Sequence, residues 1–238
     1  MAMSGSYDWT LTRAQVIAGA LRKLGVLPSG GSPSTAQTND ATDALNAIVK
    51  AFHADGMPVW AITSTTFTVT SGTASYTIGP SKTVNVAAAP LKVLQAWRHP
   101  TGEANIPMNV YNRFDFNDLP DTSTGTPVNL YYQPVLTVGV ATGIIKLWPE
   151  PDESTTTITL DYQRPFDDMD ATGDNFDFPA YWMQAIIYYL AWALAPEYGI
   201  PPTDRGLLQK EAMYWKGEAL SYGSEEGSLS FSPNTQGR

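Results

Sequence analysis

The segment TSTTFTVTSGTASYTIG (residues 63–79) decides the fold class of this chain. Its apolar residues alternate with Thr and Ser on both sides of the turn pair Ser71-Gly72; they are Phe67, Val69, Tyr76 and Ile78. A period of two is typical of a strand that buries one face, and two such runs across a turn predict a β-hairpin. A β module therefore begins near residue 59.

The β module continues through four further runs that are rich in β-branched and aromatic residues. They are Leu91 to Trp97, Val128 to Tyr132, Ile144 to Trp148 and Ile158 to Tyr162. Gly, Pro and Asp residues separate these runs, as turn-forming residues separate strands. We therefore expect an antiparallel β module over residues 59–176.

Helical periodicity precedes the β module. A first helix is expected from about Leu11 to Leu24, because Thr12 and Gln15 have the spacing of a capping box and Gly25 is placed as a stop. A second helix is expected from near Asn39 to Ala54, where apolar residues recur at intervals of three and four.

Helical periodicity returns after the β module. A third helix is expected to begin near Asp177, which has the side chain of an N-cap residue. Pro179 suits its first turn, where the missing N–H of proline costs little. A fourth helix is expected from about Asp204 to Tyr222. Its apolar face comprises Leu208, Ala212, Trp215, Ala219 and Tyr222. The sequence therefore predicts an α+β fold, in which residues 1–58 and 177–222 form a helical bundle with the β module inserted between them.

The last sixteen residues, 223–238, differ in composition from the rest of the chain. They are rich in Ser, Gly and Glu and contain only Leu229 and Phe231 as large apolar side chains. Two such residues bury too little surface to fold alone. We expect an extended C-terminal tail that a partner orders.

The charge of the chain is acidic and unevenly distributed. The formal net charge is −9, and residues 150–177 hold nine acidic residues against Arg164 alone. DNA-binding proteins draw affinity from Lys and Arg that neutralise phosphates, and no basic run is present. A sequence-specific DNA reader is therefore not expected, whereas an acidic conduit through which DNA slides is compatible with this charge.

Other bulk features indicate a protein that is neither secreted nor inserted in a membrane. The chain has no cysteine, and Met1 to Trp9 shows no basic stretch followed by an apolar run. The most apolar run, Trp182 to Ala195, is shorter than the roughly 20 residues that span a bilayer. We expect assembly in the cytosol, without a membrane.

No catalytic or cofactor motif is recognised in the sequence. Gly-x-Ser-x-Gly, Gly-Lys-Ser/Thr and Gly-x-Gly-x-x-Gly are all absent. The two histidines, His53 and His99, show no metal-ligand spacing and are interpreted as structural or surface residues. The prediction is a protein without enzymatic activity, cofactor or resident metal.

The segment DMDATGD (residues 168–174) is similar to the start of a calcium-binding loop. Such a loop needs a bidentate glutamate at its twelfth position, and here that position is Pro179. We interpret the segment as an acidic loop rich in turns. A weak Ca²⁺ or Mg²⁺ site is the alternative that the sequence leaves open.

The order of segments resembles the podovirus-type head-to-tail adaptors of tailed phages, also called tail tubular or head-completion proteins. The motifs that carry the resemblance are ALNAIVKAF (44–52), GMPVW (56–60), YYQP (131–134), LWPEPD (147–152), LDYQRP (160–165) and FPAYW (178–182). Together they extend over most of the chain, from about Ala44 to Tyr222.

The resemblance implies a non-enzymatic virion protein at the head-tail junction, assembled in the host cytoplasm. Similar proteins form a ring of twelve subunits below the portal, extend the DNA channel used in ejection, and attach tail nozzle or tail fibre proteins. It also implies that Leu229 and Phe231 dock on the portal. The acidic residues Asp167, Asp168, Asp170 and Asp174 would then face the channel or a neighbouring subunit.

Two other classes of function compete with the adaptor. A virion-associated cell-wall glycoside hydrolase is suggested by the many acids and aromatics, with Glu150, Asp161 or Glu197 as candidate carboxylates. A carbohydrate- or receptor-binding tail module is suggested by the Thr- and Trp-rich strands between Trp60 and Tyr162. The sequence alone decides neither the number of subunits nor the surface that lines a channel.

Overall fold

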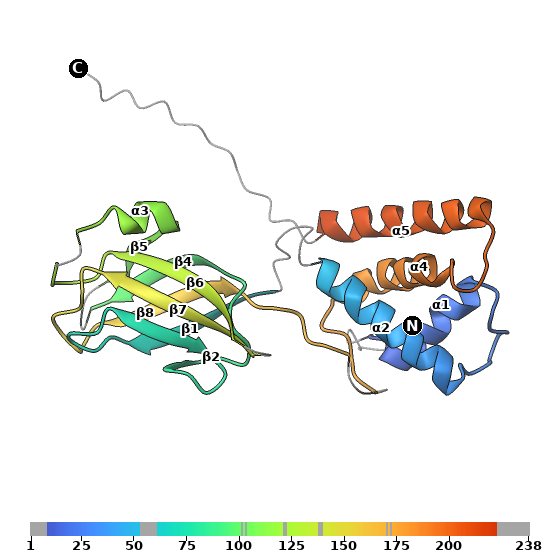
Figure 1. Ribbon diagram of the computed structural model, residues 1–238, viewed down its shortest axis with the longest axis horizontal. Coiled ribbons are helices and arrows are strands. Elements are labelled where there is room, and N and C mark those ends of the chain that lie inside the picture. Colours follow the sequence, from blue (N-terminus) through green and yellow to red (C-terminus); the bar gives the residue numbers. More distant parts are fainter. Residues whose placement is uncertain are drawn as a thin grey trace, which may run out of the picture. The chain divides into compact units, whose positions relative to one another are not determined.

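A computed structural model describes residues 9–52, 61–100, 102, 104–120, 123–137, 140–169, 171 and 173–222 of the chain. The chain divides into two compact units. The helical unit comprises Met1–Val49 and Asp168–Arg238, and the β unit comprises Lys50–Asp167. The described residues form five α-helices and an eight-stranded sheet, so the predicted α+β class is confirmed (Figure 1).

The first helix, α1 (Arg13–Lys23), has the predicted signals at both ends. Thr12 and Gln15 form a reciprocal capping box, in which each side chain accepts a hydrogen bond from the other residue's backbone N–H. Gly25 follows the helix with a φ of 71°, a left-handed conformation that favours glycine. The apolar face of this helix is buried and includes Ile17, Leu21 and Leu24.

The second helix, α2 (Thr35–Phe52), begins four residues before the predicted start at Asn39. Ser34 and Gln37 explain the difference. The Ser34 N–H donates to the Gln37 side chain, and the Gln37 N–H donates to the Ser34 hydroxyl, so this pair is a second capping box. The helix buries Ala41, Leu45, Val49 and Phe52.

The third helical segment starts as a 3₁₀ turn, η3 (Ala180–Trp182), and continues as α4 (Met183–Leu194). The N-cap residue of the first turn is Pro179 and not the predicted Asp177. Helix α4 is apolar on most sides, with Met183, Ile186 and Leu190 fully buried. It contacts both α1 and α5 and lies between them (Figure 1).

The last helix, α5 (Pro202–Tyr222), packs on α4 through small residues. Ala212 and Ala219 are the two fully buried side chains described on this helix, and they lie seven residues apart on one face. Small side chains at such a seam let two helix backbones approach closely. Tyr222, predicted for the buried face, is instead 76% exposed.

The stretch after the β unit belongs to the helical unit. The buried Arg13 guanidinium donates to the Met169 carbonyl (2.9 Å), and the Met169 N–H donates to the side chain of Asn46 (3.0 Å). Thr12 also forms an isolated β-bridge with Asn175. These contacts explain why the division falls at Asp167/Asp168, nine residues before the predicted boundary at 176/177.

The β unit contains eight strands: β1 (Ile62–Thr68), β2 (Ser75–Gly79), β3 (Val84–Asn85), β4 (Lys92–His99), β5 (Ile106–Tyr111), β6 (Asn129–Thr137), β7 (Val140–Trp148) and β8 (Thr157–Gln163). Their order in the sheet is β1-β8-β4-β5-β6-β7-β2-β3. The β5–β6 and β2–β3 pairs are parallel and the others are antiparallel. The predicted antiparallel module is therefore a mixed sheet.

The predicted hairpin of β1 with β2 is wrong. Strand β1 pairs with β8, whereas β2 pairs with β7 at the far end of the sheet. The apolar residues of both strands nevertheless enter one core, and the rings of Phe67 and Tyr76 lie 5.1 Å apart. The sheet thus curls enough for side chains of β1 and β2 to meet in one core. Two strands that pair in a hairpin and two strands that face each other across a core both show alternating apolar residues. The sequence pattern therefore does not distinguish the two arrangements.

Two local features complete the β unit. A β-bulge at Leu94 in β4 leaves one residue unpaired, which lets Val93 and Ala96 both enter the core although they are three positions apart.

The short helix α3 (Arg113–Asn117) was not predicted. Asn112 caps it by accepting hydrogen bonds from the Phe114 and Asp115 N–H groups. It lies in the connection between the parallel strands β5 and β6.

Candidate interaction surfaces

The side of α5 that points away from α4 carries a regular set of exposed residues, which we call the outer stripe. It consists of Leu207, Glu211, Tyr214 and Glu218, spaced four, three and four residues apart. This spacing keeps all four on one face over about 16 Å of helix. Leu207 is 59% exposed and Tyr214 is 58% exposed. The outer stripe therefore presents two large side chains, Leu207 and Tyr214, each followed by a carboxylate four residues later.

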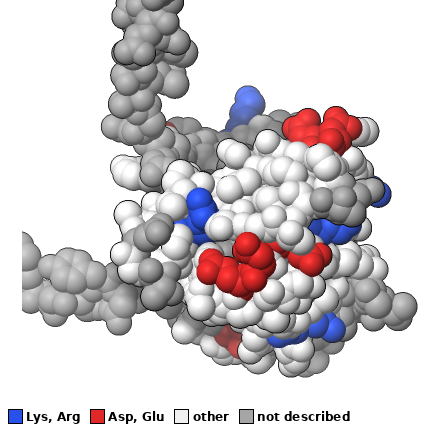
Figure 2. Space-filling model, turned by 90° about the vertical axis from the view of Figure 1, so that its left-hand side faces the viewer, with Lys and Arg blue, Asp and Glu red and all other residues white. Residues whose placement is uncertain are grey.

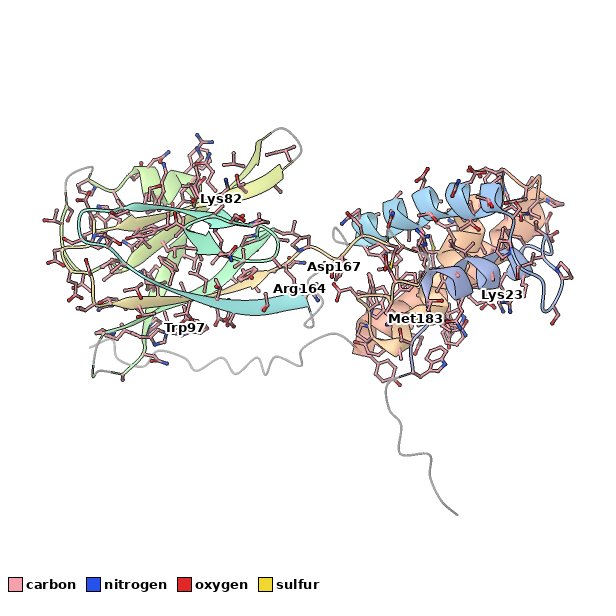
Figure 3. All side chains as sticks on the ribbon, turned by 90° about the horizontal axis from the view of Figure 1, so that it is seen from below. Lys23, Lys82, Trp97, Arg164, Asp167 and Met183 are labelled. Carbon is pink, nitrogen blue, oxygen red and sulfur yellow. The ribbon has the colours of Figure 1, made fainter. Side chains whose placement is uncertain are left out.

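A second surface of the helical unit is basic and aromatic, and we call it the basic patch. It consists of Arg22 and Lys23 in the last turn of α1 and Tyr188 on α4. The Lys23 ammonium donates to the Tyr188 hydroxyl (3.1 Å) and lies 4.7 Å from the ring centroid. Figure 3 labels Lys23 at the end of α1. Cations at a helix C-terminus are favoured by the helix dipole.

The acidic residues predicted as a site differ in their surroundings. Asp167 and Asp168 are exposed. The carboxylate of Asp174 accepts a hydrogen bond from the Ala171 N–H and is half-buried, so it stabilises a local turn. Asp170 lies outside the described residues. Within the described part of the chain, no group of three or more His, Asp and Glu side chains could hold a metal ion.

An apolar groove of about 470 Å³ lies in the β unit. Alanine and proline residues line most of it, including Pro90, Pro134 and Pro165. The hydroxyl of the buried Tyr132 donates to the Pro90 carbonyl (2.5 Å), which fixes one wall. Leu136, near the end of β6, lines the groove and is 82% exposed. Such a surface suits an apolar partner segment.

A second groove of the β unit lies along β4 and β5 and has a different chemistry. The outward-facing residues that line it are Gln95, Trp97, Pro107, Asn109 and Tyr111. Trp97 lies on the outside of the sheet (Figure 3). The Asn109 amide already donates to the Asn129 side chain (3.0 Å). This groove contains the aromatic and amide groups to which the carbohydrate-binding alternative refers.

His99 lies at the end of β4 with a partner for each ring nitrogen. Nδ1 is 2.5 Å from the Asn105 side-chain oxygen, and Nε2 is 2.7 Å from the Thr159 hydroxyl. Neighbouring polar pairs continue this outer surface, including Ser64 with Asp161 and Thr66 with Thr159. Both ring nitrogens of His99 thus have hydrogen-bond partners within the β unit. His53 lies outside the described residues.

The carboxylates considered for a glycoside hydrolase occupy separate places. Glu150 lines a groove beside α3, Asp161 accepts from Ser64 on the outer face of β8, and Glu197 follows α4 in the helical unit. Glu153 was not among these candidates. Its pKa is lowered, because the hydroxyls of Thr156 and Thr155 donate hydrogen bonds to its carboxylate. A general acid of a glycosidase needs the opposite shift.

Figure 2 shows one end of the β unit, where acidic side chains gather in separate groups and basic side chains lie between and around them. Acidic residues of this unit include Asp115 and Asp118 around α3 and Asp152 and Glu153 before β8. None of the described helices is long and apolar enough to cross a membrane. The tail residues Leu229 and Phe231 lie outside the described part of the chain.

The grooves and exposed apolar side chains of the β unit, together with the outer stripe and basic patch of the helical unit, are features typical of proteins that bind other proteins. A model of the SU10 adaptor protein family matches residues 11–226, which include parts of both units. The chain belongs to the SU10 adaptor protein family, and the predicted resemblance to phage head-to-tail adaptors is confirmed. A comparison with curated proteins finds no match.

Proposed function

We propose that this protein is a non-enzymatic head-to-tail adaptor that forms a ring below the phage portal. In this proposal the ring has twelve copies, extends the DNA channel and provides the attachment surface for tail nozzle or tail fibre proteins. It assembles in the host cytoplasm and remains in the virion during DNA ejection. The observation that carries the proposal is the family match over residues 11–226.

The division of the chain supports separate roles for its units. In the proposal, residues 1–58 and 177–222 form a helical bundle that builds the ring, and the inserted module, residues 59–176, binds tail proteins. The apolar groove with Leu136 and Pro134 supports the second role, because exposed apolar surface of this kind is typical of protein-binding sites.

The charge of the chain supports a channel through which DNA passes without being held. The sequence has 23 acidic and 14 basic residues, and Asp167 and Asp168 are exposed. Carboxylates repel phosphates, so a wall that carries them gives DNA no strong binding site. We propose that Asp167, Asp168, Asp170 and Asp174 face the channel or a neighbouring subunit.

Electron microscopy of the purified full chain mixed with the phage portal tests the proposal. We expect rings on one face of the portal, with a rotational symmetry that gives the number of copies. The chain alone and the portal alone are the controls. A chain that stays monomeric and does not bind the portal would contradict the proposed function.

A further inference from the structure

The outer stripe of α5 exposes apolar surface that the helical unit leaves uncovered. Leu207 and Tyr214 point away from the seam formed by Ala212 and Ala219, and both are more than half exposed. An isolated soluble helix normally places polar residues on its outer face. Two large apolar groups at a spacing of seven residues instead give a helix the anchors of a packing surface.

Glu211 and Glu218 give the outer stripe a net negative charge, although the exposed Lys210 lies beside Leu207 and Tyr214 on the same side of α5. Both glutamates are exposed, and within the described residues neither forms an ion pair. Each lies four residues after one of the apolar groups. A partner that covers the stripe therefore needs cationic groups beside an apolar or aromatic surface.

The basic patch has this complementary chemistry. Arg22 and Lys23 supply two cations at the end of α1, and the Tyr188 ring supplies an aromatic surface beside them. The Arg22 side chain donates only to the Ala18 carbonyl of its own helix in the described part of the chain. Its guanidinium thus keeps donors for a carboxylate of another molecule.

We propose that the outer stripe of one copy packs on the basic patch of the next copy around the ring. The inference deepens the proposed function and rests on it. The two surfaces are different, so the contact is head-to-tail and repeats from copy to copy until the ring closes. A two-fold contact of one stripe with another would instead bring Glu211 and Glu218 against like charges.

Charge reversal in the full chain, mixed with portal, tests the contact. We expect Glu211→Arg with Glu218→Arg to lower the fraction of chain in rings by about tenfold, and Arg22→Glu with Lys23→Glu to do the same. The four changes combined in one chain should restore rings, because the new arginines of one copy then face the new glutamates of the next. Asp40→Arg with Asp43→Arg, on the exposed face of α2, is the matched control.

Disulfide trapping provides a second measurement that does not depend on ring stability. The natural chain has no cysteine, so Tyr214→Cys combined with Lys23→Cys introduces the only thiols. We expect an oxidation-dependent ladder of covalent oligomers in the portal mixture. Asp40→Cys combined with Lys23→Cys should give monomers.

The outcomes separate this inference from the proposed function. If the wild-type chain forms rings and the reversed pairs form them as well as the control does, the stripe contact is wrong and the adaptor ring stands. Trapping of Tyr214→Cys on the portal instead of on a second copy also overturns the contact. If the wild-type chain forms no ring, the proposed function and this inference both fail.

Discussion

The ring of Tyr132 on β6 covers the Cα of Gly143 on the neighbouring strand β7, so that a Cβ at position 143 would overlap the ring. The same Tyr132 is buried and donates its hydroxyl proton to the Pro90 carbonyl. Gly143 therefore allows one side chain to join two strands and a loop of the β unit.

Gly143→Ala should destabilise the β unit, because the added methyl group forces Tyr132 out of this position. Overpacking of this kind costs about 1–3 kcal/mol, and the lost hydrogen bond to Pro90 adds to it. Urea denaturation measures the change in the free energy of unfolding. Gly217→Ala is the matched control: position 217 lies in α5 with open space around it, so stability should stay equal or rise. Equal stability of both variants would contradict the packing role.

The pH dependence of stability should reveal the buried Tyr132. Burial raises the pKa of Tyr132 to about 12, above its ordinary value of 10.0. The unfolded chain loses this proton first, so the stabilising contribution is complete below pH 10.0 and is lost as pH rises towards 12. Tyr132→Phe should flatten this decline in denaturation midpoints measured across the range. An unchanged slope in Tyr132→Phe would count against the prediction.

Ala212→Leu should separate α5 from α4. The wild-type side chain is fully buried against α4, and three extra carbon atoms at this seam cost about 1–3 kcal/mol of stability. Thermal unfolding checks the effect. Ala193→Leu, at an exposed position of α4, makes the same change without a neighbouring helix to displace and should leave the midpoint within error.

Arg13→Met should loosen the stretch that follows the β unit. The Met169 carbonyl loses the donor that reaches it from Arg13, and an unsatisfied buried carbonyl costs about 1–3 kcal/mol. We expect faster cleavage between residues 167 and 175 in limited proteolysis followed by mass spectrometry. Arg22→Met removes an exposed guanidinium and should leave the cleavage rate unchanged.

Leu229→Ser with Phe231→Ser should weaken binding to the portal. In the proposed function these are the large apolar anchors of the tail, and loss of two such anchors lowers affinity by about a hundredfold or more. Surface plasmon resonance with immobilised portal measures the change. Ser228→Ala with Ser230→Ala alters neighbouring positions without removing an anchor. Equal binding by both double variants would show that the tail does not carry the contact.

Much of the fold could be predicted because local signals and tertiary structure agree. Thr12, Gln15 and Gly25 define the limits of α1 by short-range hydrogen bonds and one backbone angle, and these require no knowledge of partners. The strand run from Ile158 to Tyr162 alternates cleanly because one face of β8 meets the core. The predicted family also agrees with the match over residues 11–226.

The errors arise where long-range structure decides between arrangements with the same pattern. Phe67 and Tyr76 have the spacing of a hairpin but meet across the curled sheet, because strand pairing depends on β7 and β8. The interaction surfaces were missed for a similar reason. Leu207 and Tyr214 lie seven residues apart on α5, a spacing that core residues also show. Only the position of α4 shows which face of α5 is left uncovered by the helical unit.

The hydrogen bond from Arg13 to Met169 joins residues 156 positions apart, and it has a consequence for the timing of synthesis. A nascent chain has made α1 and α2, and then the whole β unit, before the ribosome releases the segments that complete the helical unit. A product terminated before residue 202 lacks α5 and with it the outer stripe that we propose contacts the next copy. In the proposed function, only chains translated to the end of α5 could therefore join the ring.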